Sequence, residues 1–180
     1  MVKLYKNFNI KNNHKNSLIL IGNFDGVHLG HQKLFKLAKL YKKKYKIKIG
    51  VVNFDPMPKM FFNKLLKNFR ITSINQKIEL LSKLNVDFII TKKFDKNFSK
   101  TKSLNFIKEI LNKKLKSKFI FVSNNFRFGN KREGNVNLLI KNEKKFNFKV
   151  VKPEPLIKQR KIISSTLIRG LLENGYLEKA

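Results

Sequence analysis

The chain has 180 residues, enough for one ordinary domain, and its 42% hydrophobic and 12% aromatic residues exclude a disordered segment. It has no cysteine, no apolar run near the roughly 20 residues of a membrane span and no visible secretory signal, so we expect no disulfide, no membrane attachment and a cytoplasmic location. Its net charge of +30, from 41 Lys and Arg residues against 11 Asp and Glu residues, fits either a polyanionic partner or the codon bias of an A/T-rich genome, because Asn, Ile and Phe are abundant as well.

Short β-rich runs alternate with amphipathic stretches along the chain. Strands are predicted at residues 17–23, 47–54, 86–91, 119–122 and 146–152, and helices at 29–45, 73–84, 103–115, 135–145 and 165–172. Ser73 and Gln76 have the spacing of a capping box at the start of the second helix. This alternation predicts an α/β fold with a parallel sheet covered by helices on both faces, and in such sheets ligands bind beyond the carboxyl ends of the strands.

The first strand-to-helix loop, residues 22–31, carries the strongest chemical pattern. Gly26 and Gly30 allow tight turns and a close approach of the backbone to a ligand. The helix that follows offers free N–H groups and the positive end of its dipole, which suit a phosphate. His28 and His31 are three residues apart, so both imidazoles can donate to one phosphate and stabilise charge that develops there.

Other interpretations of this loop are weaker. A metal pair would find only Asp25 as an additional ligand nearby, and the sequence has no H-E-x-x-H motif. The loop matches neither the phosphate-binding Walker A pattern nor the dinucleotide G-x-G-x-x-G pattern, which argues against a P-loop kinase and a nicotinamide dehydrogenase. We therefore interpret the loop as a phosphate site of another kind.

The loop Gly-Asn-Phe-Asp-Gly-Val-His-Leu-Gly-His, residues 22–31, resembles the signature of the bacterial FAD synthetase family. Its core, His-Leu-Gly-His, is similar to the H-x-G-H of the wider nucleotidyltransferase superfamily. Three later segments match the family in order: residues 53–58 (Asn-Phe-Asp-Pro-Met-Pro), 122–129 (Val-Ser-Asn-Asn-Phe-Arg-Phe-Gly) and 163–169 (Ile-Ser-Ser-Thr-Leu-Ile-Arg). The resemblance covers essentially the whole chain and implies a Rossmann-like nucleotidyltransferase fold.

The resemblance implies a role for each matched segment. It implies catalytic residues at His28, His31 and Arg169; ATP-binding residues at Gly22, Asn23, Phe24, Asp25, Gly30, Ser164, Ser165 and Thr166; and flavin-binding residues at Phe54, Asp55, Pro56, Asn125, Phe126, Arg127 and Phe128. Physically, hydroxyls at a helix start and the planar fork of an arginine suit a triphosphate. Alternatives remain open: an ordinary N-cap for the serines, a turn for residues 54–56 and core positions for the two later phenylalanines.

Two departures from the family pattern matter. Met57 stands where the family has His, and Ser123 stands where it has Gly. The resemblance also implies a mobile stretch at residues 57–69 near the flavin ring. The chain shows no sequence that matches the riboflavin kinase domain of the bifunctional members, so we expect residues 1–180 to form an FMN adenylyltransferase domain without kinase activity.

The resemblance thus implies an FAD synthetase that transfers AMP from ATP to FMN, with Mg²⁺ accompanying ATP. The enzyme alternative is a sibling nucleotidyltransferase that uses another phosphorylated acceptor. A different alternative is a basic nucleic-acid-binding module on an inactive fold, which the charge permits. We regard nucleic acid as an unlikely partner, because the lysines are spread along the chain instead of massed in one tail. The oligomeric state is not predicted.

Overall fold

The computed structural model describes residues 2–66 and 69–180. Its helices are α1 (Leu29–Tyr45), α2 (Pro58–Phe62), α3 (Ile74–Ser82), α4 (Lys96–Ser99), α5 (Ser103–Asn105), α6 (Val136–Lys141), α7 (Glu143–Phe146) and α8 (Ser165–Glu173). Its strands are β1 (Lys3–Tyr5), β2 (Leu18–Ile21), β3 (Ile49–Asp55), β4 (Phe88–Lys93), β5 (Phe119–Phe121), β6 (Arg127–Phe128), β7 (Gly134–Asn135), β8 (Lys149–Val151), β9 (Ile157–Lys158) and β10 (Lys161–Ile162). Shorter helical turns are η1 (Asn12–His14), η2 (Asp25–Val27), η4 (Asn130–Arg132) and η5 (Leu177–Lys179), and η3 (Phe106–Lys114) continues α5 with π-helical geometry.

Six strands form one sheet in the order β1-β4-β3-β2-β5-β8, and every neighbouring pair is parallel. The chain enters the sheet interior at β2, winds outward through β3 and β4, and then crosses to β5 and β8 on the other side. This order confirms the expected α/β fold. It also makes the carboxyl ends of β2 and β5 the point where the winding reverses, which is where open parallel sheets bind ligands.

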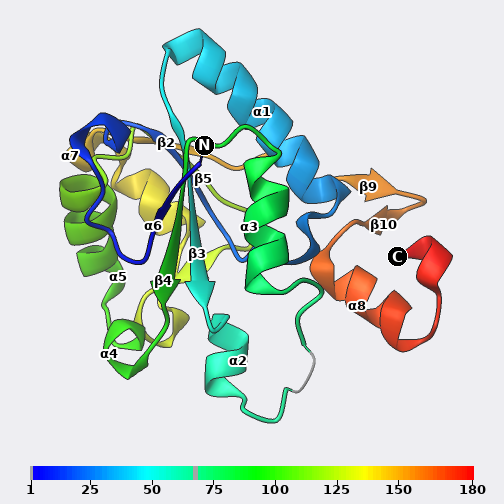
Figure 1. The fold of residues 1–180 in the computed structure, drawn as a ribbon. Helices are drawn as coiled ribbons and strands as arrows, with labels where there is room; N and C mark the ends of the chain where they lie inside the picture. Colours follow the sequence, from blue (N-terminus) through cyan, green and yellow to red (C-terminus); the bar gives the residue numbers. More distant parts are fainter. Residues whose placement is uncertain (1, 67–68) are drawn as a thin grey trace.

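Each face of the sheet has its own hydrophobic core, because alternate residues of a strand point to opposite faces. Leu18 and Leu20 of β2 pack with residues of α1 and α3, including Phe35 and Leu81. The intervening residues of β2 pack on the other face with η3 and α6. Figure 1 shows this arrangement, with α1 and α3 on one side of the sheet and α5, α6 and α7 on the other. Both faces are covered, as the sequence predicts.

The helix boundaries agree with the predictions where a cap is present. The helix predicted at 29–45 is α1, and the capping box of Ser73 and Gln76 is formed at the start of α3. The helix predicted at 135–145 is divided into α6 and α7 at Asn142, whose amide donates to the Leu138 carbonyl. The strand predicted at 146–152 is shorter in the structure, where it is β8. It begins later because α7 continues to Phe146 and ends at the left-handed Asn147 (φ 50°).

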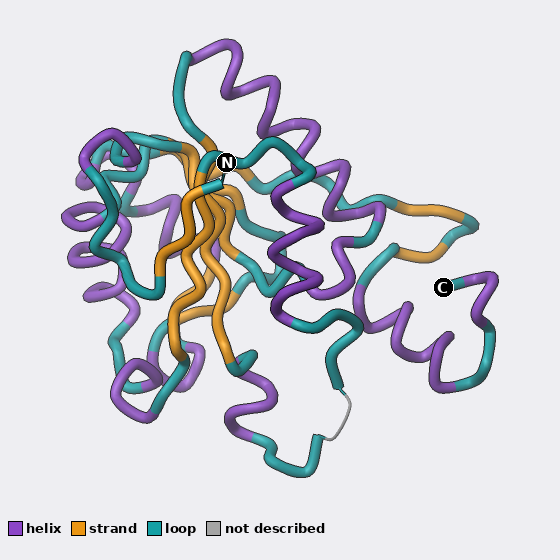
Figure 2. Tube along the Cα trace, viewed as in Figure 1, coloured by secondary structure: helices purple, strands orange, loops and turns teal. Residues whose placement is uncertain are grey.

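Some features of the structure differ from the predictions or were not predicted. An edge strand, β1, pairs in parallel with β4. A hairpin of β9 and β10 precedes α8, and Figure 2 shows this C-terminal segment lying beside α1 and α3. The predicted mobile stretch 57–69 contains the helix α2, and its residues 67–68 lie outside the described part of the chain. Within the described part, no helix combines the length and the apolar character needed to span a bilayer.

Candidate functional site

The loop after β2 holds two histidines against each other. Phe24 and Gly26 take positive φ values of 49° and 76°, which bend the chain into η2 before α1 begins. His28 is the N-cap of α1, and its Nδ1 accepts the backbone N–H of His31 at 3.4 Å. The two imidazole rings are stacked, with centroids 3.6 Å apart and an angle of 23° between their planes. The structure thus places both histidines together at the start of the helix, as the sequence predicts.

Both histidines are held in the neutral form. Burial, together with a smaller effect of the neighbouring His28, lowers the pKa of His31 to about 3. Burial also lowers the pKa of His28, an effect that Asp25 opposes and Arg169 reinforces. A neutral imidazole keeps one N–H donor, so each ring can still donate one hydrogen bond to a phosphate oxygen.

An aromatic side chain fixes the orientation of the inner histidine. The Phe24 ring meets the His31 ring edge-on at 5.2 Å and packs against Phe35 at 5.4 Å. Phe24 is only 3% exposed, so its ring belongs to the core. The sequence assigned Phe24 to ATP binding; in this position only its backbone is available for that role.

Asp25 joins three segments that are distant in the sequence. Its carboxylate is 2% exposed and accepts the backbone N–H groups of Ile71 and Thr72 at 3.1 and 3.2 Å. It also accepts from Arg169 Nη2 at 3.1 Å, while its backbone carbonyl accepts the Ser165 hydroxyl at 2.9 Å. The first loop, residues 71–72 and the start of α8 are therefore fixed to one another through Asp25.

Arg169 is positioned by more than its ion pair. Its guanidinium lies 4.0 Å from the centroid of the Phe69 ring, and its Nε donates to the Phe69 carbonyl at 2.8 Å. The side chain is 16% exposed. Among the described residues Nη1 has no hydrogen-bond acceptor, so this nitrogen remains able to donate to a ligand.

The start of α8 lies directly against the histidine loop. A Cβ atom on Gly30 would stand 2.9 Å from the Ile163 carbonyl oxygen, so only glycine permits this approach. Ser164 caps α8 by accepting the Leu167 N–H at 3.2 Å, which confirms the N-cap interpretation without excluding a ligand contact. Thr166 is exposed, and no hydrogen bond of its hydroxyl is found in the described part of the chain. The residues predicted for the phosphates are thus brought together where the start of α8 packs against the start of α1.

Four of the seven residues predicted for the flavin line an aromatic cavity of about 130 Å³. Phe54, Phe126, Arg127 and Phe128 line it, and the rings of Phe126 and Phe128 are stacked at 5.5 Å. Residues that the sequence analysis did not single out complete the lining: Pro58, Phe62, Phe94, Phe98, Ser99, Thr101, Phe106, Gly129, Lys131 and Arg132. The cavity suits a flat ring with polar edges.

The other predicted flavin residues lie beside this cavity instead of lining it. Asp55, at the end of β3, forms an ion pair with Arg70. Pro56 follows it in the bend before α2. Asn125 is exposed, and its side chain accepts the Ser123 hydroxyl at 2.9 Å. Met57, in place of the family's His, is 2% exposed and packs into the protein.

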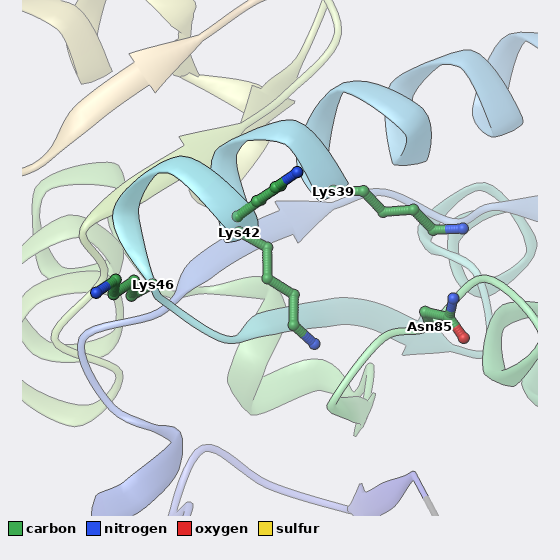
Figure 3. Close-up of a pocket in the computed structure, with 5 residues that line it drawn as sticks. Lys39, Lys42, Lys46 and Asn85 are labelled. Atoms are coloured by element: carbon green, nitrogen blue, oxygen red, sulfur yellow. The ribbon is translucent and has the colours of Figure 1, made fainter.

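A second hollow on the surface belongs to a different region. Lys39, Lys42, Lys43, Lys46 and Asn85 line it, as Figure 3 shows. It lies at the C-terminal end of α1, roughly 25 Å from His28 by the rise of a 17-residue helix. Its lysines are one more part of the dispersed positive charge, and one of them, Lys42, is paired with Asp87 at 2.7 Å.

The polar side chains around the histidine loop do not form a metal-binding centre within the described residues. Residues 2–66 and 69–180 contain no group of three or more His, Asp or Glu side chains that could hold an ion. The carboxylate nearest to the histidines, Asp25, already accepts from Arg169 and two backbone N–H groups. A magnesium ion at this site would thus be held mainly by substrate phosphates and water, in the manner usual for Mg²⁺ with nucleotides.

Sequence reasoning missed Phe69, Arg70 and Thr72, which connect the two halves of the site. The pairing of Arg70 with Asp55 and of Phe69 with Arg169 spans 15 and 100 residues. The only sequence signal nearby is the capping box at Ser73, which fixes where α3 begins and so where residues 69–72 must pass.

Comparisons with known proteins agree with this geometry. The family model for FAD synthetase matches residues 10–167. The chain is 45% identical over 172 residues to a bifunctional riboflavin kinase/FMN adenylyltransferase of Buchnera aphidicola (subspecies Acyrthosiphon pisum), covering 96% of this chain and 55% of that protein. It is 33% identical over 163 residues to the protein of the same description from Escherichia coli K12, covering 91% and 52%. The chain spans about half the length of these curated relatives.

Solved structures share the fold. A structure described as a macrolide-efflux protein from Streptococcus pneumoniae superposes with a TM-score of 0.79 at 24% identity, covering 94% of this chain and 55% of that one. A pantoate-beta-alanine ligase from Francisella tularensis superposes with a TM-score of 0.61 at 15% identity, covering 94% and 73%. At these identities the likeness supports the Rossmann-like α/β fold alone.

Proposed function

This chain belongs to the FAD synthetase family, and from that membership we propose that it transfers the adenylyl group of ATP to FMN, giving FAD and pyrophosphate. The observation that carries the proposal is the junction of two helix starts, those of α1 and α8. A stacked pair of histidines begins α1, a serine-rich segment begins α8, and Asp25 fixes the two to each other. Neutral donors and a helix N-terminus are suited to a polyphosphate.

The proposed reaction is a direct displacement at the α-phosphorus of ATP. A phosphate oxygen of FMN forms the new bond to that phosphorus, and the bond to the bridging oxygen of the pyrophosphate breaks. No protein nucleophile is required, so catalysis depends on position and on stabilisation of charge. His28 and His31 would donate to the non-bridging oxygens, and Arg169 would donate from Nη1 to the departing pyrophosphate.

The remaining predicted residues would bind the substrates. Gly22, Asn23 and Gly30 would supply loop backbone to the triphosphate, and Ser165 and Thr166 would supply the start of α8. The aromatic cavity beside Phe126 and Phe128 would hold part of the isoalloxazine ring, with Arg127 at its polar edge. ATP would enter as its magnesium complex, so Mg²⁺ is part of the substrate here.

An acceptor panel tests this proposal. The pure protein is mixed with MgATP and, in separate tubes, FMN, riboflavin, nicotinate mononucleotide or phosphopantetheine, and pyrophosphate release is followed. We expect pyrophosphate release in the FMN tube and in none of the other three. Release with another phosphorylated acceptor and not with FMN would replace FMN by that acceptor. Formation of FMN in the riboflavin tube would contradict the assignment of adenylyl transfer as the single activity.

A further inference from the structure

One buried lysine at the site has no role in the account so far. Lys77, in the first turn of α3, is 3% exposed, and with Leu81 one turn later it forms the buried face of that helix. No hydrogen bond or ion pair of its ammonium is found in the described part of the chain, although Nζ is not among the fully enclosed atoms without a partner. Lysine side chains are seldom this deeply buried without a partner, because removing the charge from water is costly.

The surroundings of Lys77 place it between the two halves of the site. Thr72 bonds to the first loop just before α3 begins, which brings the first turn of α3 next to Asp25. The charges that act on the Lys77 ammonium are those of Asp25, Arg70 and Asp55. Asp25 belongs to the histidine loop and Asp55 to the end of β3, near the aromatic cavity.

The charges of this cluster do not balance. Asp25 is paired with Arg169 and Asp55 with Arg70, so both carboxylates already have a cation of their own. Lys77 is therefore a third cation among two anions. Burial lowers the pKa of Lys77 and Arg70 adds to this effect, whereas the two carboxylates oppose it. An anion placed here would restore the balance.

A second, independent feature of the same region is an unsatisfied amide. Asn53 is fully buried, and neither Oδ1 nor Nδ2 of its side chain has a hydrogen-bond partner within the described residues. Strand alternation puts Asn53 on the same face of β3 as Asp55 and Val51, and Val51 belongs to the core that contains Leu81 of α3. Buried polar groups are nearly always paired, so an unpaired amide on this face calls for an explanation.

We propose that Lys77 binds a phosphate group of the substrates, on the side of the site that also holds the unpaired amide of Asn53. This inference rests on the proposed function for the identity of the substrates, but the chemistry it requires is only that of a phosphate. A phosphate offers several acceptor oxygens and a negative charge, which match an ammonium with three N–H donors. The phosphate belongs either to the triphosphate of ATP or to FMN, which approach each other at this point.

The experiment compares Lys77→Met with the wild-type protein in two binding titrations. One uses inorganic tripolyphosphate and reports on the ATP side, and the other uses FMN. Loss of one charged hydrogen bond should weaken binding roughly ten- to hundredfold in at least one titration, and the titration affected identifies the phosphate. Lys36→Met, which removes an exposed lysine of α1, is the matched control and should bind both probes as the wild type does.

Two further results decide the matter. Lys77→Met keeps the apolar stem and removes an unpaired charge, so we expect it to unfold at a urea concentration no lower than the wild type does. Unchanged binding of both probes by folded Lys77→Met would overturn the inference. Because these titrations need no turnover, a protein that binds phosphate through Lys77 yet makes no FAD would refute the proposed function and leave this inference standing.

Discussion

The guanidinium of Arg169 lies 3.1 Å from the carboxylate of Asp25, although 144 residues separate them in the sequence. Both side chains are largely buried, so this ion pair holds α8 against the histidine loop in a poorly solvated place. The site therefore depends on a contact between the two ends of the domain.

The two partners of this pair should not contribute independently to stability. Arg169→Met leaves the Asp25 charge buried with its arginine gone, and we expect a loss of about 3–5 kcal/mol in the free energy of unfolding. The double variant Asp25→Asn/Arg169→Met should lose clearly less than the sum of the single variants. Urea titrations measure all four proteins. Additive losses would show that the two side chains do not interact in the folded protein.

The histidine pair should matter for turnover and not for folding. His31→Ala removes a donor to the reacting phosphate, and we expect turnover to fall by about 10²–10³ with little change in circular dichroism. His14→Gln is the control: His14 bonds to the Tyr5 hydroxyl at 2.8 Å and stacks on Phe88, at the amino end of β4. This variant should lose stability and keep its turnover. Near-normal turnover of His31→Ala would remove this residue from the catalytic site.

Acid should destabilise the protein partly through His31. Its folded pKa of about 3 lies below the ordinary value of 6.5, so between these values the unfolded chain takes up a proton that the folded protein does not. Stability therefore falls as the pH drops below 6.5, by up to about 1.4 kcal/mol per pH unit from this residue. His31→Gln should lose less stability than the wild type between pH 7 and pH 5 in urea titrations. Equal losses in the two proteins would contradict the low pKa.

Gly30 should tolerate no side chain. In Gly30→Ala the new methyl group would meet the Ile163 carbonyl at 2.9 Å and push the start of α8 away from the loop. We expect weaker ATP binding and slower turnover. Gly170→Ala is the matched control within α8, because nothing lies within 4 Å of the added methyl group and alanine favours a helix by about 1 kcal/mol. If both substitutions affect ATP binding equally, the close approach of α8 is not what matters.

The aromatic cavity should govern FMN and leave ATP unaffected. Phe126→Leu removes a ring that stacks on Phe128 beside the cavity. We expect KM for FMN to rise about tenfold, in line with the loss of a stacking contact, while KM for ATP stays within twofold. Steady-state assays that vary one substrate at a time measure both values. A selective rise in KM for ATP would reverse the assignment of the two halves of the site.

Local patterns predicted the parts of the fold that local chemistry determines. The bounds of α1 follow from the apolar spacing along the helix, and the start of α3 follows from the capping box of Ser73. The β9–β10 hairpin was missed because its turn residues, Gln159 and Arg160, adopt positive φ without the Asn or Gly that normally signals it. The edge strand β1 was missed because it is only three residues long and mostly exposed.

The sequence predicted which residues lie at the candidate site but not the contacts between them. The histidine loop and the start of α8 were both expected at the phosphates, and the structure places them together. No local pattern indicates that the Arg169 guanidinium is partly occupied by Asp25 and Phe69, because such pairings depend on how distant segments pack. The burial of Lys77 is likewise visible only in three dimensions.

The central claim is tested most directly by measuring FAD and pyrophosphate together. The pure protein is incubated with FMN and MgATP, and both products are quantified by chromatography and a coupled assay, beside the His28→Ala/His31→Ala double variant. The account predicts FAD and pyrophosphate in equal amounts from the wild type and almost none from the variant. Folded wild-type protein that forms no FAD, or a double variant that forms it at the wild-type rate, would contradict it.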